Sequence, residues 1–433
     1  MPAFTALTAS AYIDYMKIHF VGISGVSMRA LADFAASRGN TVSGSDSLLC
    51  GHDPKNVEGC DLVVYTNAVK KDNCELVRAK ELGIPTIERA EYLGELSKTY
   101  GKVVAVAGCH GKSTTTAMLG SCFSGRNATV HVGVANGSRV GGDKFFITEA
   151  CEYRASFLHL SPDVGVVLNV QYDHPDYYKD YDSLKRAYRS FCDNCKTVIV
   201  NGDDEECTVL TDKAITFGVG KNCDYRAVDI RSENGCRSFT LVGKKHARVR
   251  LSVVGEHNVY NALATIAAAS ECGMSLTECL PALNKFRGIP RRFERKGIAF
   301  GKTVFTDYAH HPTEIAATIS SAKEIFPSVA VVFQPHTYTR TESLMDGFAD
   351  ALSQADTVVL APIFSAREAQ TEGVSSHTLC RKIVEKKDKA YCFDTFTEII
   401  EYCKALNEKA VIFMGAGDIN KAADLLVAAD LCD

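Results

Sequence analysis

Short apolar runs recur along the chain and are separated by longer amphipathic segments. Runs of strand type stand at residues 103–107, 164–170, 330–334 and 410–414. Continuous runs of this length are typical of strands that are buried on both faces of a parallel sheet. The segments between them carry apolar residues at helical spacing, as in residues 28–35. Strands that alternate with helices predict an α/β fold throughout.

The length of the chain predicts more than one domain. A chain of 433 residues is too long for one ordinary hydrophobic core, so we expect two to three domains. The pattern divides most naturally into three, at residues 1–99, 100–290 and 291–433. The first begins with a strand–turn–helix–strand unit, and the last opens with a hairpin about Gly297 and Gly301.

The stretch from Val103 to Leu119 predicts a phosphate-binding loop. An apolar strand leads into a glycine turn, then into Lys112 and Ser113, and then into a helix. Such a turn directs free N–H groups at an anion, the lysine reaches the outer phosphates, and the serine hydroxyl can bind Mg²⁺. The full motif has a glycine six residues before the lysine, where this chain has Val106. The shorter pattern still favours a nucleotide site over an ordinary loop.

Acidic residues and a histidine follow two of the predicted strands near this loop. Glu149 ends the strand at 145–149, and Asp173 and His174 follow the run at 164–170. Ligands bind at the carboxyl ends of parallel strands, and Mg²⁺ prefers carboxylates together with phosphate oxygens. We therefore predict a metal site here. The alternative is a helix-capping role for Asp173 and a packed surface position for His174.

The glycine turn near the N-terminus predicts a second, weaker anion site. It resembles a dinucleotide-binding motif, but Ser24 and Ser27 replace two of its glycines, and Gly22 and Gly25 remain. NAD binding is therefore poorly supported. A nucleotide phosphate or ribose at this helix start is still sensible, with Asp46 as the acceptor for a hydroxyl group.

Composition narrows the class of protein. Hydrophobic residues make up 46% and charged residues 23%, the net charge is −4, and no apolar run is long enough to span a membrane. These values give no reason to expect a nucleic acid or a membrane as partner. We interpret residues 1–16 as a short leader arm rather than a signal peptide, and expect a cytoplasmic protein. The 17 cysteines are scattered, and Cys192 with Cys195 is weak evidence for zinc.

Ten stretches in order along almost the whole chain resemble the Mur ligases of peptidoglycan synthesis. They are GISGVSM from Gly22, SGSD from Ser43, GCHGKSTTT from Gly108, EACEYRASFLHLSP from Glu149, Asp173-His174, HNVYNALA from His257, RRFE from Arg291, DYAHHPTEI from Asp307, FQPHTYTRT from Phe333 and GAGDI from Gly415.

The resemblance implies a fold and an activity. The implied architecture is an N-terminal Rossmann-like domain for the UDP-sugar, a central P-loop ATPase domain with a parallel sheet, and a C-terminal Rossmann-like α/β domain. Within the family, the chain is most similar to members that join L-alanine to the lactyl carboxylate of UDP-N-acetylmuramate. ATP and Mg²⁺ are the implied cofactors. We expect a monomer or weak dimer.

Site residues follow from the same resemblance. ATP contacts are expected at Gly108, His110, Gly111, Lys112, Ser113, Thr114, His257, Asn258, Asn261, Arg292 and Asp307, and UDP-sugar contacts at Gly22, Ser24, Gly25, Ser43 and Asp46. Metal contacts are expected at Ser113, Glu149 and His174, and catalytic contributions from Lys112, His174, Arg292, His310, His336 and Arg340, with His311 beside them. His310 and His336 are candidates to take the proton of the attacking amine.

Some features depart from the family pattern, and other functions stay open. Ser113 stands where a threonine is usual, and no lysine near Lys185 and Arg189 clearly matches the carbamylated lysine of sister ligases. The alternatives are a related ligase that attaches a peptide, a non-catalytic UDP-sugar and ATP sensor of the same fold, and a P-loop kinase or motor. The last leaves the first domain and the stretches from His257 and Asp307 unexplained.

Overall fold

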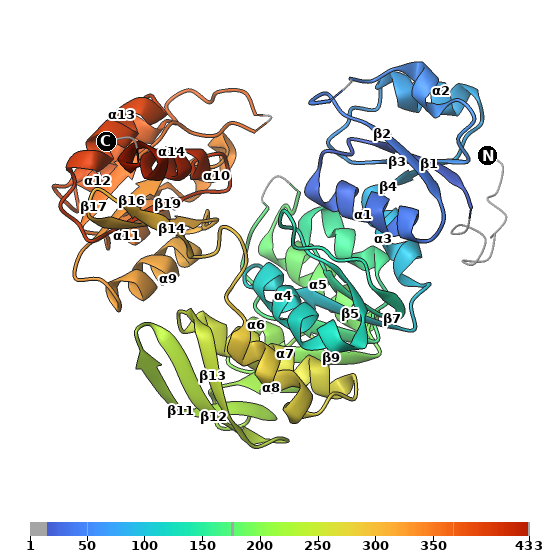
Figure 1. Ribbon diagram of the computed structural model, residues 1–433, viewed down its shortest axis with the longest axis horizontal. Coiled ribbons are helices and arrows are strands. Elements are labelled where there is room, and N and C mark those ends of the chain that lie inside the picture. Colours follow the sequence, from blue (N-terminus) through green and yellow to red (C-terminus); the bar gives the residue numbers. More distant parts are fainter. Residues whose placement is uncertain (1–14, 50, 175–176, 367, 432–433) are drawn as a thin grey trace. The chain divides into compact units, whose positions relative to one another are not determined.

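The computed structural model describes residues 15–49, 51–174, 177–366 and 368–431 as an α/β protein (Figure 1). Nearly all of the predicted leader arm lies outside the described residues. Two compact units are defined by their internal contacts. Unit 1 comprises residues 1–226, 241–247 and 260–283, and unit 2 comprises residues 227–240, 248–259 and 284–433.

The first sheet is small and entirely parallel. Its strand order is β2-β1-β3-β4. The strands are β1 (Lys17–Val21), β2 (Thr41–Ser45), β3 (Leu62–Tyr65) and β4 (Thr86–Glu88), and the helices are α1 (Val26–Ser37), η2 (Pro54–Val57), α2 (Cys74–Glu81) and α3 (Arg89–Ser97). Gly39 follows α1 with φ of +86°, a left-handed conformation that ends the helix as the sequence predicts.

The second sheet has nine strands in the order β13-β12-β11-β10-β9-β8-β5-β7-β6. Its strands are β5 (Lys102–Ala107), β6 (Ala128–His131), β7 (Gly142–Glu149), β8 (Val164–Val167), β9 (Thr197–Asn201), β10 (Ile215–Gly218), β11 (Tyr225–Glu233), β12 (Cys236–Gly243) and β13 (Ala247–Val254). The helices along this part of the chain are α4 (Lys112–Cys122), η3 (Phe123–Arg126), η4 (Tyr153–His159), α5 (Tyr181–Asp193), α6 (Glu205–Thr208), α7 (His257–Glu271) and α8 (Leu276–Lys285). β5 lies between β7 and β8 and pairs with both in parallel.

The third sheet is doubly wound, with the order β14-β15-β19-β16-β17-β18. Only its edge pair, β14 with β15, is antiparallel among the pairings between described strands. The strands are β14 (Glu294–Ala299), β15 (Lys302–Asp307), β16 (Val329–Phe333), β17 (Thr357–Leu360), β18 (Ala390–Cys392) and β19 (Ala410–Met414). The helices are α9 (Pro312–Lys323), α10 (Tyr338–Ser343), α11 (Met345–Leu352), α12 (Ser376–Val384), α13 (Phe396–Ala405) and α14 (Asn420–Asp430).

Alternate residues of this third sheet enter different hydrophobic clusters. Val331 and Ile412 pack with α9, α11 and α12, whereas Val332 and Phe413 pack with α13 and α14. A sheet covered by helices on both faces needs apolar residues at successive positions, which is why its strands are continuous apolar runs.

The run predicted as a strand over 164–170 is only partly a strand. β8 ends at Val167, and the following residues have no regular structure. After Val167 the chain bonds the phosphate loop instead of continuing the strand: the Asn169 carbonyl accepts from the Cys109 N–H at 3.3 Å, and the Asn169 side chain bonds the His110 backbone. Among the described residues the next helix is α5, which begins at Tyr181 with Asp180 as its cap, so Asp173 caps no described helix.

Candidate active site

The predicted phosphate loop joins β5 to α4 in unit 1. Gly108 and Gly111 have φ of +135° and +85°, which L side chains rarely adopt, so glycine is required at both turns. α4 begins at Lys112 and leaves the first backbone N–H groups of the helix at the loop. A loop of this shape at a helix N-terminus favours an anion.

Residues after β8 hold this loop in shape. The side-chain oxygen of Asn169 accepts from the His110 N–H at 2.9 Å, and its amide donates to the His110 carbonyl at 3.0 Å. Gln171 contacts the His110 ring at 3.0 Å and accepts from the Cys109 thiol through its carbonyl at 2.9 Å. On the other side, the Thr115 hydroxyl donates to Asn261 at 3.2 Å. Contacts within the protein therefore hold the loop in this shape.

Lys112 and Glu152 form a buried ion pair beneath the loop. The ammonium lies 2.9 Å and 3.0 Å from the two carboxylate oxygens, and it also donates to the carbonyls of Gly108 and Cys109. Only 1% of Glu152 is exposed. Burial alone would raise the pKa of this carboxyl, but Lys112 and His174 outweigh it and lower the pKa below its ordinary value. The carboxylate is thus ionised and holds a cation.

His174 lies against the same carboxylate. Its Nε2 is 3.7 Å from Glu152 and 3.8 Å from Asp173, and its ring packs on Tyr153 with centroids 4.7 Å apart. The backbone of His174 is left-handed, with φ of +57°. Non-glycine residues in this conformation concentrate at functional sites. Tyr178 supports the cluster, because its hydroxyl donates to the Glu152 carbonyl at 2.5 Å.

The structure redirects the prediction for the acidic metal ligand. β7 ends at Glu149 as predicted, but the Glu149 carboxylate accepts from the Gly133 N–H at 2.6 Å. The carboxylate beside Lys112 and His174 belongs to Glu152, three residues later. A direct metal role for Glu149 stays a prediction, and Glu152 is the stronger candidate on geometry.

The donor set suits Mg²⁺ bound together with phosphate. Ser113, Glu152 and His174 offer a hydroxyl, a carboxylate and an imidazole near the loop, and the Lys112 ammonium already sits in a cage of oxygen atoms. No group of three or more His, Cys, Asp or Glu side chains among the described residues could hold a metal alone. Mg²⁺ commonly uses one or two protein carboxylates and takes its other ligands from phosphate and water, so the residues fit.

The N-terminal turn is also preformed in unit 1. Gly22 has φ of +89°, and a Cβ there would lie 2.6 Å from Thr66. The Asp46 carboxylate accepts from the N–H groups of Ser24 at 3.2 Å and Leu48 at 3.0 Å, and Gly25 precedes α1. The Ser43 hydroxyl instead contacts His19 at 2.8 Å, inside the sheet.

Arg89 adds a positive charge near the start of α1. Its guanidinium donates to the Ser27 hydroxyl at 3.3 Å, and that hydroxyl also contacts His131 at 2.9 Å. A guanidinium beside a helix N-terminus favours a phosphate-bearing ligand.

Unit 2 gathers another group of predicted residues. Arg292 pairs with Glu314 at 3.3 Å, and the Asp307 carboxylate accepts from the N–H groups of Phe293 and Ala309 at 2.7 Å. Burial raises the pKa of Asp307 to about 6, although Arg292 opposes the rise. His257 lies within electrostatic reach of Arg292, and burial lowers its pKa to about 4. Asn258 donates to the Val254 carbonyl at 2.7 Å.

His310, His336 and Arg340 come together in the same unit. The two imidazole rings have centroids 6.3 Å apart, and the positive charge of Arg340 contributes to lowering the pKa of both. Burial lowers the pKa of each histidine to about 4, so both are neutral at pH 7 and are weak bases. His311 has a structural contact, because its ring accepts from the Thr313 N–H as the cap of α9.

Sequence reasoning missed four residues that shape these sites: Arg89, Glu152, Asn169 and Gln171. Glu152 lies in a stretch used for the family resemblance, but nothing in one sequence separates it from Glu149 before the chain is folded. Asn169 and Gln171 contact the loop from the segment after β8, where the sequence had predicted a strand as far as Val170.

Comparisons with known proteins cover the whole site. Residues 17–100 match the Mur ligase family, catalytic domain, residues 106–269 match the Mur ligase middle domain, and residues 291–417 match the Mur ligase, glutamate ligase domain. A UDP-N-acetylmuramate–L-alanine ligase of Acetivibrio thermocellus is 41% identical over 449 residues, covering 95% of this chain and 96% of that protein. The chain belongs to the Mur ligase family.

Other Mur ligases also match this chain over nearly its whole length. A UDP-N-acetylmuramate–L-alanine ligase of Lachnospira eligens is also 41% identical, over 95% of this chain and 98% of that protein. A crystal structure of the UDP-N-acetylmuramate–alanine ligase of Thermotoga maritima matches with a TM-score of 0.83 at 29% identity, covering 96% of this chain and all of that one. The predicted fold class and family are confirmed. The site residues and the domain limits stay predictions.

One further finding concerns membranes. In the part of this Mur ligase that the structure describes, every helix is too short or too polar to cross a bilayer.

Proposed function

We propose that this Mur ligase joins L-alanine to the lactyl carboxylate of UDP-N-acetylmuramate, with cleavage of ATP to ADP and phosphate. The observation that carries the proposal is the buried Lys112–Glu152–His174 cluster beneath a preformed phosphate loop. Relatives with about the same length and 38–41% identity bear the name of this activity. The reaction belongs to peptidoglycan synthesis.

Amide formation in water needs an activated carboxylate. Transfer of the γ-phosphoryl group of ATP to the lactyl carboxylate gives an acyl phosphate. The amine of L-alanine attacks it through a tetrahedral intermediate, and phosphate leaves. Such transfers depend mainly on positioning and on neutralising charge. In this chain Lys112 supplies the fixed positive charge at the loop, and the N–H groups at the start of α4 supply the rest.

Lys112 must exchange partners when a triphosphate binds. Its ammonium is held by Glu152 in the structure, and burial would lower its pKa but the Glu152 carboxylate raises it. Lys112 therefore stays charged and can move from Glu152 to the outer phosphates. Ser113, Glu152 and His174 would then hold Mg²⁺, which offsets the charge of the triphosphate when bound.

Residues of unit 2 supply the remaining contacts. Arg292 is assigned to phosphate and Asp307 to the ribose hydroxyls. His257 and Asn258 are assigned to the nucleotide, and so is Asn261, which belongs to unit 1. His310, His336 and Arg340 are assigned to the amino-acid end. Since both histidines have a pKa of about 4, they serve better as neutral hydrogen-bonding groups than as the base for the amine.

The UDP part of the sugar nucleotide is assigned to the turn before α1. Gly22, Ser24, Gly25 and Asp46 surround this turn, and Arg89 adds a cation for the diphosphate. The Ser43 hydroxyl contacts His19, so we assign Ser43 a supporting role through that residue rather than a contact with UDP. The 15 cysteines among the described residues are free thiols, which suits the cytoplasm, where both nucleotides are found.

Phosphate release from ATP by the full chain tests the proposal. We expect release only when UDP-N-acetylmuramate, L-alanine and Mg²⁺ are all present, with formation of the amide product by mass. Release with neither the sugar nucleotide nor the amino acid would indicate a plain ATPase. Release that needs a peptide instead of L-alanine would indicate a peptide-adding ligase, and no release would indicate a sensor. Glycine and L-serine are the competitors to test, since one methyl or hydroxyl group discriminates by only about 1–3 kcal/mol.

A further inference from the structure

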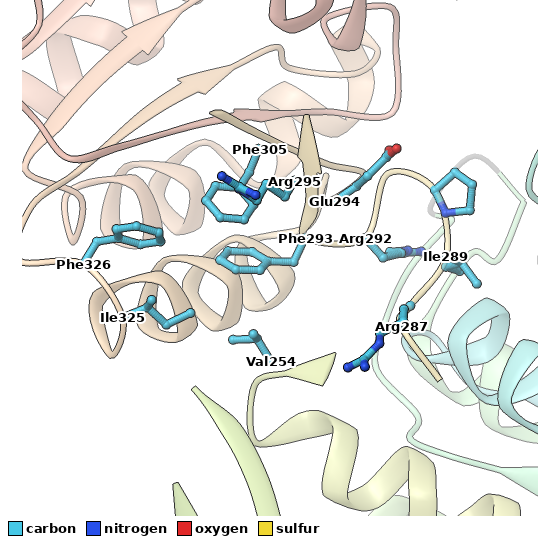
Figure 2. A pocket seen from close by; sticks show the side chains of 12 residues that line it. Val254, Arg287, Ile289, Arg292, Phe293, Glu294, Arg295, Phe305, Ile325 and Phe326 are labelled. Atoms are coloured by element: carbon cyan, nitrogen blue, oxygen red, sulfur yellow. The ribbon is translucent and has the colours of Figure 1, made fainter. Parts of the chain in front are cut away.

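A buried carboxylate in unit 1 has no part in the contacts assigned so far. The cavity of about 540 Å³ in unit 2 does have one, because its lining includes Arg292, which is assigned to the phosphates of ATP (Figure 2). Glu75, in the first turn of α2, is 0% exposed. A charged group is unfavourable in the protein interior unless it is paired and hydrogen-bonded, so the partners of Glu75 indicate what it does.

Polar groups from three segments of the chain surround the Glu75 carboxylate. They are His19 on β1, Ser45 at the end of β2, and His52, Asp53 and Asn56 in the segment that follows β2. One oxygen accepts from the Ser45 hydroxyl at 2.5 Å and from the His52 ring at 2.8 Å, and the other accepts from the Asn56 amide at 2.6 Å. Burial would raise the pKa of Glu75, but hydrogen bonds from these side chains outweigh it and lower the pKa to about 2. The carboxylate is therefore ionised at pH 7.

Ser45 connects Glu75 to the turn assigned to UDP. Its hydroxyl donates to Glu75, while its carbonyl accepts from the N–H groups of Gly22 at 2.8 Å and Ile23 at 3.1 Å. The next residue along the chain is Asp46, whose carboxylate is also assigned to UDP. The position of Ser45 therefore fixes both the start of the glycine turn and the backbone that carries Asp46.

His19 holds the same end of β2 from the neighbouring strand. Its Nδ1 contacts the Ser43 hydroxyl at 2.8 Å, and its Nε2 lies 3.3 Å from the Ser45 hydroxyl and 3.5 Å from Glu75. His19 is 1% exposed and Ser45 is 0% exposed, so water does not compete for these contacts. The supporting role assigned to Ser43 thus belongs to the same network.

Glu75 also holds the segment that follows Asp46. The Gly51 N–H donates to the Asp46 carbonyl at 3.1 Å, and the next residue, His52, is bonded to Glu75. One carboxylate thereby binds the chain on both sides of Asp46, at Ser45 and at His52. An apolar side chain could fill this space, but it could not fix the polar groups in one arrangement.

We propose that Glu75 is a positioning residue for UDP-N-acetylmuramate, which holds the Gly22 turn and Asp46 in their binding arrangement through Ser45 and His52. The inference rests on the proposed assignment of this turn to UDP. Because Glu75 is completely buried, it acts through its partners and not by contact with the ligand. A purely structural carboxylate would change the stability of the protein without changing its affinity for the sugar nucleotide.

Calorimetric titration of the full chain tests this inference, with UDP-N-acetylmuramate and a non-hydrolysable ATP analogue as separate ligands. Glu75→Gln keeps the size of the side chain but removes its charge and one acceptor oxygen. We expect it to weaken UDP-N-acetylmuramate at least tenfold and to leave the ATP analogue within twofold of the wild type. In steady-state assays, KM for the sugar nucleotide should rise by a similar factor while kcat stays within twofold.

Ser45→Ala is a milder variant that tests the same connection if Glu75→Gln does not fold. It removes the hydroxyl group between Glu75 and the end of β2, but it keeps the carboxylate with its bonds to His52 and Asn56. We expect this variant to weaken UDP-N-acetylmuramate at least threefold, again without an effect on the ATP analogue.

Two control variants separate positioning from a general loss of stability. Val63→Ala removes packing from β3 of the same sheet, in a hydrophobic cluster with Val21 and Val57. Glu408→Gln neutralises another buried carboxylate, which accepts from the Thr357 hydroxyl in unit 2. Both should lower the Tm, and both should bind UDP-N-acetylmuramate within twofold of the wild type.

The outcomes distinguish this inference from the proposed function. Wild-type affinity for the sugar nucleotide in both Glu75→Gln and Ser45→Ala would overturn the positioning role and leave the ligase proposal intact. An equal loss of affinity for the ATP analogue, or an equal loss of sugar-nucleotide affinity in Val63→Ala, would also overturn it. Failure of the wild type to bind UDP-N-acetylmuramate would overturn the assignment of the turn to UDP, and this inference with it.

Discussion

At the scale of single residues, two neighbouring glutamates differ sharply in their surroundings. Glu152 faces Lys112 and His174 in a buried site, whereas Glu149 accepts from the Gly133 N–H. We predict that Glu152→Gln lowers kcat by about 10²–10³, because it removes the charge that positions Lys112 and Mg²⁺. Glu149→Gln is the matched control in size and charge, and should cost less than about tenfold. Steady-state phosphate release over a range of Mg²⁺ concentrations measures both.

The Mg²⁺ dependence separates a metal role from a structural one. If Glu152 holds Mg²⁺, the residual activity of Glu152→Gln requires a higher Mg²⁺ concentration than that of the wild type. If Glu149→Gln is the variant with the larger loss and the shifted Mg²⁺ requirement, then the strand-end carboxylate is the metal ligand, as the sequence suggested.

Asp307 gives a second prediction at this scale, concerning pH. Burial raises its pKa from the ordinary 3.8 to about 6, so the folded chain binds this proton more tightly than the unfolded chain does. The stability that this group contributes is complete below pH 3.8 and is lost as the pH rises through 6. Asp307→Asn carries no such proton. Its unfolding free energy, relative to the wild type, should therefore rise between pH 5 and pH 8.

The size of this change has an upper bound. A shift of about two pKa units corresponds to at most about 3 kcal/mol. Asparagine has one acceptor oxygen for the two N–H groups of Phe293 and Ala309, which lowers the stability of the variant at both pH values and leaves the pH-dependent change intact. Urea denaturation of both proteins at pH 5 and pH 8 measures the effect. A difference between them that does not change with pH would contradict the assignment.

Residue types were predictable from the sequence, but their partners were not. The motif identified Lys112 and Ser113, because strand, turn and helix follow one another within a short stretch. It did not identify Glu152, which meets Lys112 only after β7 and η4 have folded. Likewise, Asp307 could be named from its stretch, but its raised pKa depends on burial that no local pattern reports.

At the scale of elements, the phosphate loop depends on two glycine turns. Gly111 has φ of +85°, and a Cβ there would lie 2.6 Å from the Asn261 side-chain oxygen. We predict that Gly111→Ala destabilises the fold by about 1–3 kcal/mol, from backbone strain and from that contact. It should also weaken ATP binding by at least tenfold, because the loop must move. Thermal unfolding and calorimetric titration with an ATP analogue measure the two effects.

Gly59 provides the matched comparison for this variant. It has a similar φ of +75°, but a Cβ there would meet nothing within 4 Å. Gly59→Ala should therefore show the strain alone, about 1 kcal/mol, with ATP affinity unchanged. Equal losses of stability and affinity in both variants would mean that the Asn261 contact does not shape the loop.

The element pattern was predictable where local signals were strong. The hairpin of β14 and β15 and the helix begun by Pro312 were expected, since turn glycines and a proline in the first helical turn are local cues. The end of β8 at Val167 was not, because the residues that follow it bond the phosphate loop, which is distant in the sequence. Tertiary contacts of this kind override an apolar run.

At the scale of the whole molecule, the sequence resemblance carried more than any single motif. Ten ordered stretches predicted a family. The family models that match residues 17–100, 106–269 and 291–417 confirmed it. The internal contacts define two compact units, and the predicted limits of the three domains stay a prediction. Linker composition does not record how many contacts each segment makes, so the sequence alone does not define such units.

The last prediction concerns the independence of the phosphate loop and the turn assigned to UDP, both of which belong to unit 1. Lys112 belongs to the phosphate loop, whereas the turn assigned to UDP lies before α1 and is held by Asp46 and Ser45. Lys112→Ala should therefore abolish turnover, because no other described side chain places a positive charge at that loop position, while the UDP-N-acetylmuramate affinity stays within about twofold. Calorimetric titration with the sugar nucleotide and phosphate release measure the two properties separately.

Removing Lys112 also leaves the Glu152 carboxylate without its cation, so some loss of stability is expected from an uncompensated buried charge. Lys112→Arg keeps that charge and should recover stability without recovering turnover, since the planar guanidinium is larger and differently shaped. Near-normal turnover in Lys112→Ala would refute the assignment of the loop. Loss of sugar-nucleotide binding in Lys112→Arg, with stability intact, would instead show that the two sites are coupled.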